Sequence, residues 1–450
     1  MGDRLATIAT IKPTRQRVFL VIILFITLLF SFLDRINMSV LLADTTFLSE
    51  LGIKNDTVKM GLLMSVFLII YAASNVVLSP LGDLLGSRKA ILTCLPVWAA
   101  AMLFGSFAPT FAWMLASRGM LGLGEGMHYP VQMKFVKNWF PPFERGKANS
   151  VWQFSLFVGP AIAMPFFTWQ VKQFGWRMSF IILAAATIIP FLLVWYFTAD
   201  HPRDHKWVNQ SERSHIEAGL RRELEAEANL TTASFGETLR SFVFNYRYLL
   251  LLAYFFFNAA VWWGIMTWLP SYLKVARGFS WTQMGALASL PYIFGGICLV
   301  IFGYFSDIAD RRAPFCAVAM IGMALALYLG AHATNNFSSA YLITIAVGFN
   351  AVGLPATWSL CQQLVPTRAL GTGAGLMNGV GSVGGALSPI VIGYFIGVNG
   401  GSYVGGLMCL VVSSIAGALC MLVLVFQKYQ WMADLEENLL YLPPWKEEFS

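Results

Sequence analysis

Charged residues are scarce in this chain. Asp, Glu, Lys and Arg together make up 12% of its 450 residues, whereas 57% of the residues are hydrophobic. Soluble domains usually contain about 25% charged residues. This shortage excludes an ordinary soluble enzyme and a disordered scaffold, and it indicates a chain that lies within a membrane.

Histidine and cysteine are also few, at five and six residues. The cysteines lie in or beside apolar segments without the spacing of a metal site, so we expect neither a metal nor a disulfide. No phosphate-binding loop and no Ser/His pair stands in the apolar segments, which argues against an enzyme and predicts no cofactor. The net charge of +7 does not indicate a nucleic-acid partner, because the basic residues form short clusters between apolar runs.

Apolar segments dominate the rest of the chain, and each is long enough to cross a bilayer as a helix of about 20 residues. None alternates every second residue as a porin strand would. We therefore predict an all-α, multi-pass membrane protein with twelve transmembrane helices. The segments are roughly 17–42, 58–79, 89–107, 111–134, 148–169, 178–198, 247–272, 281–305, 314–333, 338–362, 370–396 and 402–426.

The positions of Lys and Arg predict the orientation. If both termini are cytoplasmic, most basic residues outside the spans fall in the inner segments. We expect a monomer in a bacterial-type inner membrane. A plasma or organelle membrane stays open, because Asn55-Asp-Thr57 and Asn336-Phe-Ser338 are glycosylation sequons in predicted outer loops.

A single long polar stretch divides the chain. We predict an N-terminal six-helix bundle over 1–198, a cytoplasmic linker over 199–246 and a C-terminal six-helix bundle with a short tail over 247–450. The linker contains an expected amphipathic helix over 211–229. A short motif after the second span, Asp83-Leu-Leu-Gly-Ser-Arg88, recurs after the eighth span as Asp307-Ile-Ala-Asp-Arg311. The recurrence indicates that the two halves arose by duplication.

With these motifs the chain resembles the major facilitator superfamily over nearly its full length. Five further motifs occur in order along the chain: Asp34-Arg35-Ile-Asn37, Gly122-Leu-Gly-Glu125-Gly126, Trp139-Phe-Pro141, His201-Pro-Arg-Asp204 and Thr267-Trp-Leu-Pro270. With them the chain is similar to the anion:cation symporter family within that superfamily. The resemblance implies a major facilitator fold, alternating access and transport of a sugar acid or another small carboxylate, with Asp83, Arg88, Asp307 and Arg311 forming a cytoplasmic gate.

Four ionisable residues lie deep in the spans of the first half: Asp34, Arg35, Arg118 and Glu125. Such groups are costly in a bilayer and usually mark a transport path. We assign Arg35 to the cavity, because its guanidinium group can donate two parallel hydrogen bonds to a carboxylate, and we direct Asp34 toward Arg118. An alternative is that the four charges only hold two helices together.

These charges also predict the coupling ion. Two acids and two arginines sum to zero, so a bound carboxylate leaves a net negative charge that a proton on Glu125 would neutralise. This predicts symport of a proton with an organic anion, with Asp34, Arg118 and Glu125 in the coupling. The resemblance agrees, since it implies that Arg35 binds the anion and that Glu125 carries the proton.

Neutral candidates for substrate binding come from the resemblance alone: Tyr71, Asn75, Trp358, Ser359 and Asn378. Three positions differ from the sugar-acid members: Phe32, Leu156 and Phe255 stand where those members have polar side chains. A separate comparison concerns the phosphate-ester exchangers, which have a second arginine at the position of Trp262. These changes make the expected cavity less polar. They disfavour a dianionic phosphate, and they favour a small or more apolar acid over a heavily hydroxylated hexonate.

Two other functions stay open. An anion/anion exchanger would not need protonation of Glu125. A membrane sensor built on a transporter fold would bind a ligand without moving it.

Overall fold

The computed structural model describes residues 12–228, 240, 242–308, 311–366 and 369–426, and these are almost entirely helical. The first half contains α2 (Gln16–Leu41), α3 (Thr45–Glu50), α4 (Thr57–Leu85), α5 (Ser87–Ser106), α6 (Phe111–Gly126), α7 (His128–Trp139), α8 (Pro142–Gln153), α9 (Ser155–Phe174), α10 (Trp176–Ala186) and α11 (Ile188–Phe197). The linker forms η2 (Pro202–Asp204) and α12 (Gln210–Ala228). The second half contains α14 (Tyr246–Ser271), η3 (Tyr272–Ala276), α15 (Trp281–Ile308), α16 (Ala313–His332), α17 (Asn336–Leu364), α18 (Leu370–Val398) and α19 (Tyr403–Phe426).

Within the described residues, 11 helical segments are long and apolar enough to cross a membrane. The predicted span over 111–134 is not in that set; it forms α6 and α7, which are separated at Met127, and the charged side chains of Arg118 and Glu125 lower its hydropathy. Pro130 lies in the first turn of α7 and has no N–H to donate to the carbonyl of Gly126, which weakens the helix at this point. α6 nevertheless packs against α4 and α5 as part of the bundle. The prediction of an all-α, multi-pass membrane protein is confirmed.

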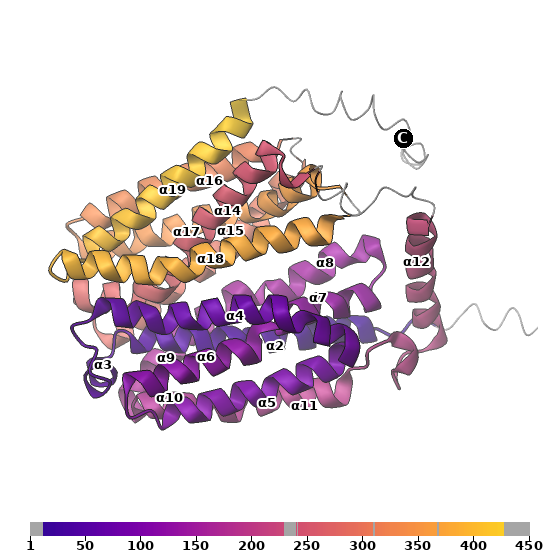
Figure 1. Ribbon diagram of the computed structural model, residues 1–450, viewed down its shortest axis with the longest axis horizontal. Helices are drawn as coiled ribbons and strands as arrows, with labels where there is room; N and C mark the ends of the chain where they lie inside the picture. Colours follow the sequence, from indigo (N-terminus) through magenta and orange to yellow (C-terminus); the bar gives the residue numbers. More distant parts are fainter. Residues whose placement is uncertain (1–11, 229–239, 241, 309–310, 367–368, 427–450) are drawn as a thin grey trace, which may run out of the picture.

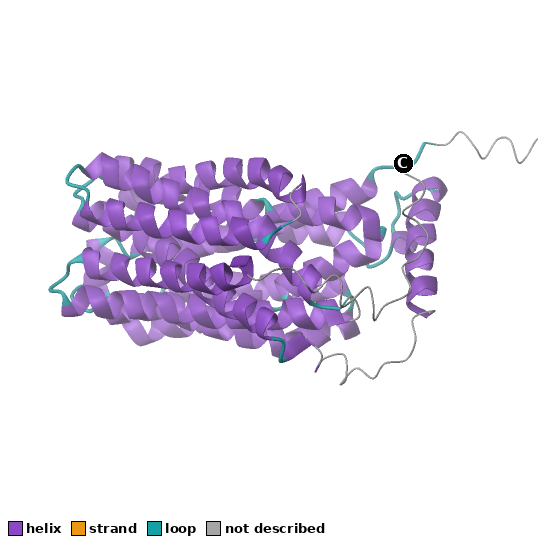
Figure 2. Ribbon diagram, turned by 90° about the horizontal axis from the view of Figure 1, so that it is seen from above, coloured by secondary structure: helices purple, strands orange, loops and turns teal. Residues whose placement is uncertain are grey.

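The helices form two groups that face each other. In Figure 1, α2–α11 make up one group and α14–α19 the other. Contacts between the groups are made chiefly by α4 with α18, α9 with α15 and α2 with α14. Seen from above, the long helices share one direction, and α12 stands across one end of them (Figure 2).

The contact between α4 and α18 is tight at the end of the molecule that carries α3. α4 begins there at Asp56, whose carboxylate accepts the Lys59 N–H; this hydrogen bond lowers the pKa of Asp56. The Thr57 hydroxyl donates to the Gly393 carbonyl at 2.6 Å, and Gly61 lies against the backbone of Pro389 with no room for a side chain. Further along α18, by contrast, a side chain at position 375 or 379 would meet nothing within 4 Å. The two groups of helices are therefore in close contact at the α3 end of α4.

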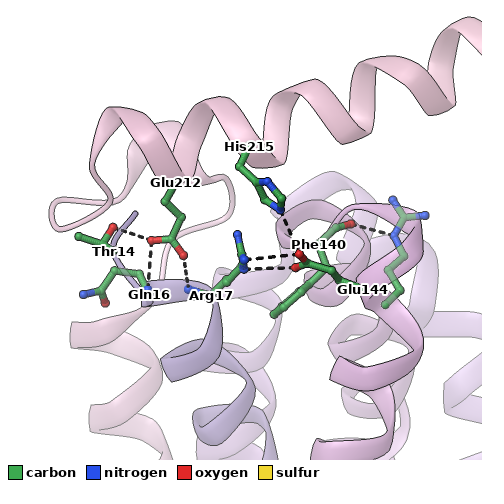
Figure 3. A network of polar contacts seen from close by, with 8 residues as sticks. Thr14, Gln16, Arg17, Phe140, Glu144, Glu212 and His215 are labelled. Carbon is green, nitrogen blue, oxygen red and sulfur yellow. Dashed lines mark hydrogen bonds and ion pairs between the residues drawn. The ribbon is translucent and has the colours of Figure 1, made fainter. Parts of the chain in front are cut away.

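The linker helix is attached to the first group by buried polar contacts (Figure 3). α2 has no side-chain cap of its own at Arg15. Glu212 of α12, which is fully buried, supplies one: its carboxylate accepts the backbone N–H groups of Gln16 and Arg17 at 3.1 Å each and the Thr14 hydroxyl at 2.5 Å. The expected amphipathic helix is thus present as α12, and the carboxylate of its Glu212 caps the start of α2.

A second set of contacts joins α12 to the start of α8. Glu144 pairs with Arg17 of α2 at 3.3 Å, and the Nε2 atom of His215 in α12 lies 3.0 Å from the same carboxylate. Figure 3 shows Glu144 between these two partners. Two helices of the first group, α2 and α8, are therefore joined to the linker helix α12 at this end of the molecule.

Candidate functional site

A cavity of about 170 Å³ lies between the two groups of helices. Aromatic and aliphatic side chains form most of its wall, and a few polar groups interrupt them. The first group contributes Phe32, Arg35, Leu68, Tyr71, Tyr129, Gln153, Leu156 and Phe157. The second contributes Phe255, Asn258, Ala259, Trp262, Trp263, Asn350, Leu354, Trp358, Asn378, Gly381 and Ser382.

Arg35 lies in the wall of this cavity and forms a buried ion pair. Its Nη2 atom is 2.7 Å from Oε2 of Glu125, and their side chains are 5% and 0% exposed. The Ser31 hydroxyl donates to the same carboxylate oxygen at 2.6 Å, so α2 supplies two donors to one acid on α6. The other oxygen of Glu125 has no hydrogen-bond partner in the described part of the chain. The acid is thus held at one oxygen and free at the other.

Aromatic rings surround the Arg35 guanidinium group. Its carbon lies 4.7 Å from the ring centre of Phe32, 5.3 Å from Phe67, 5.0 Å from Tyr71 and 5.5 Å from Trp263. A cation near the face of an aromatic ring is attracted by the ring's electrons. Trp263 belongs to α14, so these contacts connect the cation of the first group to the second group.

The expected contact between Asp34 and Arg118 is not formed, and this prediction is corrected. Asp34 instead accepts a hydrogen bond from the indole N–H of Trp98 in α5. Arg118 donates from Nε to the Leu63 carbonyl at 3.3 Å, and its two Nη atoms have no hydrogen-bond partner among the described residues. The buried indole of Trp98 thus supplies the hydrogen bond to Asp34 that Arg118 was expected to supply. Asp34 and Arg118 still interact electrostatically, without direct contact.

The neutral residues predicted to bind substrate fall into two sets. Tyr71, Trp358 and Asn378 line the cavity. Asn75 and Ser359 do not belong to its lining; Asn75 interacts with the hydroxyl of Tyr71 from one helical turn away. The three substituted positions, Phe32, Leu156 and Phe255, all line the cavity, as does Trp262. The substitutions therefore change the wall of the site itself.

Four further polar residues line the cavity and were not predicted: Gln153 at the end of α8, Asn258 in α14, Asn350 in α17 and Ser382 in α18. A signal was present in the sequence, because an amide in the middle of an apolar segment is costly unless it has a role. Asn258 and Asn350 meet that description. They add hydrogen-bonding groups to a wall that was expected to be largely apolar.

The predicted gate residues are described only in part. The side chains of Asp83 and Asp307 lie outside the described residues. Arg88 donates its backbone N–H to the Asp200 carboxylate at 2.8 Å, and its guanidinium group donates to the Trp195 carbonyl. Arg311 is exposed. The gate therefore stays a prediction.

Solved structures support the arrangement of the helices. A bacterial homolog of the human lysosomal transporter Spinster, in an inward-facing and unoccupied conformation, superposes with a TM-score of 0.73, covering 92% of this chain and 98% of its own. Its sequence identity is 17%, so the similarity concerns the fold.

Sequence relatives cover most of the chain. A D-galactonate transporter of Escherichia coli is 26% identical over 92% of this chain and 96% of its own length. A probable sulfoacetate transporter of Cupriavidus necator is 30% identical over 81% and 84%. A probable galactarate/D-glucarate transporter of Bacillus subtilis is 28% identical over 92% and 93%. The family model described as Major Facilitator Superfamily matches residues 24–389. The chain belongs to the major facilitator superfamily of membrane transporters.

Proposed function

We propose that this protein is a secondary active transporter that couples the movement of a proton to the uptake of a small organic anion by alternating access. The observation that supports it is the ion pair between Arg35 and Glu125 at the cavity wall. This arginine is the one basic side chain among the described residues that line the cavity. The carboxylate of Glu125 is already paired with the Arg35 guanidinium group, which a substrate carboxylate would need to bind.

Competition for Arg35 provides the coupling. When Glu125 is ionised, its oxygen at 2.7 Å from Arg35 holds the guanidinium group. A proton on Glu125 removes the charge of that partner, and Arg35 becomes free to donate two parallel hydrogen bonds to a substrate carboxylate. Loss of the proton restores the internal ion pair and displaces the anion. Proton and anion therefore bind together and leave together.

The relatives support an organic anion as the substrate. Their names specify transport of D-galactonate, galactarate or glucarate, and sulfoacetate, and all of these are organic acids. They differ in chain length, in the number of hydroxyl groups and in charge. The shared chemistry is an anionic group on a small carbon skeleton, which fits one guanidinium group in a cavity of about 170 Å³.

Alternating access is supported by the unequal contacts at the two ends of the molecule. α4 and α18 are in close contact near Thr57 and Gly393, whereas a Cβ atom at position 375 or 379 of α18 would meet nothing within 4 Å. Transporters of this architecture move by rocking one half against the other around a central site. We propose that the contact at Thr57 opens when the opposite end closes.

Uptake into proteoliposomes tests the function. Labelled aldonates, uronates, and small mono- and dicarboxylates would be offered with and without an imposed inward proton gradient. We expect at least one of these anions to accumulate only with the gradient. Accumulation that instead requires an anion preloaded inside the vesicles would contradict symport and establish an exchanger.

A further inference from the structure

We infer that the cavity selects monoanionic hydroxy acids over the corresponding dianions, and that Asn258 and Asn350 bind the neutral, hydroxyl-bearing end of the substrate. This inference rests on the proposed function for the identity of the anion site at Arg35. It adds a second subsite, on the opposite group of helices, and a charge class for the substrate.

The two asparagines are buried polar groups that face the cavity. Asn258 is 8% exposed and Asn350 is 5% exposed, and both line the cavity from the second group of helices. The Asn258 amide has no hydrogen-bond partner among the described residues. Asn350 makes one weak contact, from Nδ2 to the sulfur of Met323 at 3.9 Å. Neither amide is among the fully buried, unpaired atoms of the described residues; both face the cavity, where their donors and acceptors are available to a ligand.

The chemistry of an amide indicates which ligand group fits. Each asparagine offers two N–H donors and a carbonyl acceptor. A hydroxyl group can accept from the N–H and donate to the carbonyl. A carboxylate can only accept, so it would leave the amide carbonyl unpaired and facing a negative charge. A pair of asparagines therefore suits hydroxyl groups better than a second carboxylate.

Charge leads to the same conclusion. No lining residue of the second group is basic, and the described lining as a whole contains Arg35 as its one cation. A dianion with one carboxylate at Arg35 would place its other carboxylate against amides and rings such as Phe255, Trp262 and Trp358. A buried charge without a partner is strongly unfavourable. A single proton on Glu125 would compensate for one carboxylate and leave the second uncompensated.

Matched ligands test the inference directly. D-Galactonate and galactarate differ only in that a terminal CH₂OH is oxidised to a carboxylate, and glycerate and tartronate form the same pair with a shorter skeleton. Trp262, Trp263 and Trp358 line the cavity, so binding to the purified, full-length protein can be followed by tryptophan fluorescence. We expect the monoanion of at least one pair to bind about tenfold or more tightly than its dianion at neutral pH. Equal or tighter binding of the dianions, or no binding by any of the four, would overturn the inference.

Variants test the role of the asparagines. Asn258→Leu and Asn350→Leu keep side chains of similar size and remove the amide. We expect each to weaken binding of the monoanion by about tenfold while changing binding of its deoxy analogue, which has no hydroxyl groups, much less. Asn399→Leu, at the exposed end of α18, is the control and should leave both affinities unchanged. An equal loss for both ligands in the cavity variants would show a structural role and refute the subsite.

The binding measurement also separates this inference from the proposed function. It uses no proton gradient and no membrane transport. If galactonate binds selectively but no gradient drives its accumulation, the subsite stands and symport fails. If galactarate accumulates with the gradient as well as galactonate does, symport stands and the charge selectivity fails.

Discussion

The carboxylate of Glu125 and the guanidinium group of Arg35 are joined at 2.7 Å, although the residues are 90 positions apart and come from different helices. Both side chains are almost completely buried, and Arg35 also lines the cavity. Taking two charges out of water costs free energy that can exceed their mutual attraction, so a buried ion pair by itself adds little to stability. Because the pair lies beside a cavity, Arg35 can bind either the Glu125 carboxylate or the carboxylate of a substrate.

Arg35→Lys tests the need for the guanidinium group. We expect uptake to fall by about 100-fold or more, because an ammonium group cannot donate two parallel hydrogen bonds to a carboxylate. The variant keeps the positive charge beside Glu125, so its melting temperature in detergent should stay close to that of the unmodified protein. Normal uptake in this variant would refute the assignment of Arg35 as the anion site.

Trp98→Phe tests the hydrogen bond to Asp34. The change removes the indole donor and leaves an aromatic ring in the same space. We expect uptake to fall about tenfold, because a buried carboxylate loses its hydrogen bond beside the coupling residues. Trp113→Phe is a matched control, since that indole donates to the Phe104 carbonyl at an exposed site. Equal uptake in the two variants would show that Trp98 has no part in transport.

Glu212→Ala tests the contact between α12 and α2. The fully buried carboxylate accepts two backbone N–H groups at the start of α2, as an N-cap residue would. Loss of such a cap typically costs about 1 kcal/mol, so the melting temperature should fall clearly. Glu217→Ala removes an exposed pair with Arg213 on the same helix and should change stability little. If the two variants have the same melting temperature, Glu212 does not stabilise the start of α2.

Gly61→Ala tests whether the contact between α4 and α18 must close during transport. A methyl group at this position would collide with the backbone of Pro389. We expect uptake to fall by about tenfold, because the end of the molecule near α3 could no longer close fully. Gly146→Ala adds a methyl group where nothing lies within 4 Å and should leave uptake unchanged. Full activity of the Gly61 variant would mean that this contact has no role in the cycle.

The sequence predicted the class of the fold and part of the site for identifiable reasons. The hydrophobic segments are long, so the helices could be predicted from length alone. Arg35 and Glu125 were singled out because charges inside apolar segments are rare. The positions that differ from the sugar-acid members, Phe32, Leu156 and Phe255, line the cavity as expected. They could be placed because the resemblance supplied the alignment.

Other features depend on tertiary contacts that no local pattern specifies. Trp98 lies 64 positions from Asp34, and nothing near either residue indicates that one accepts a hydrogen bond from the other. The capping of α2 by Glu212 joins residues 195 positions apart or more. Asn258 and Asn350 could have been noticed as amides in apolar segments, but their shared cavity is visible only once α14 and α17 are packed together.

Proton uptake on anion binding tests the central claim most directly. The purified protein would be mixed, in weakly buffered solution, with an anion that the fluorescence measurement has shown to bind. The pH change would be recorded for the unmodified chain and for Glu125→Gln. The account predicts that binding removes protons from solution in the unmodified protein and removes none in the variant, which still binds the anion. Proton uptake that persists in Glu125→Gln, or anion binding without any proton uptake in the unmodified protein, would contradict it.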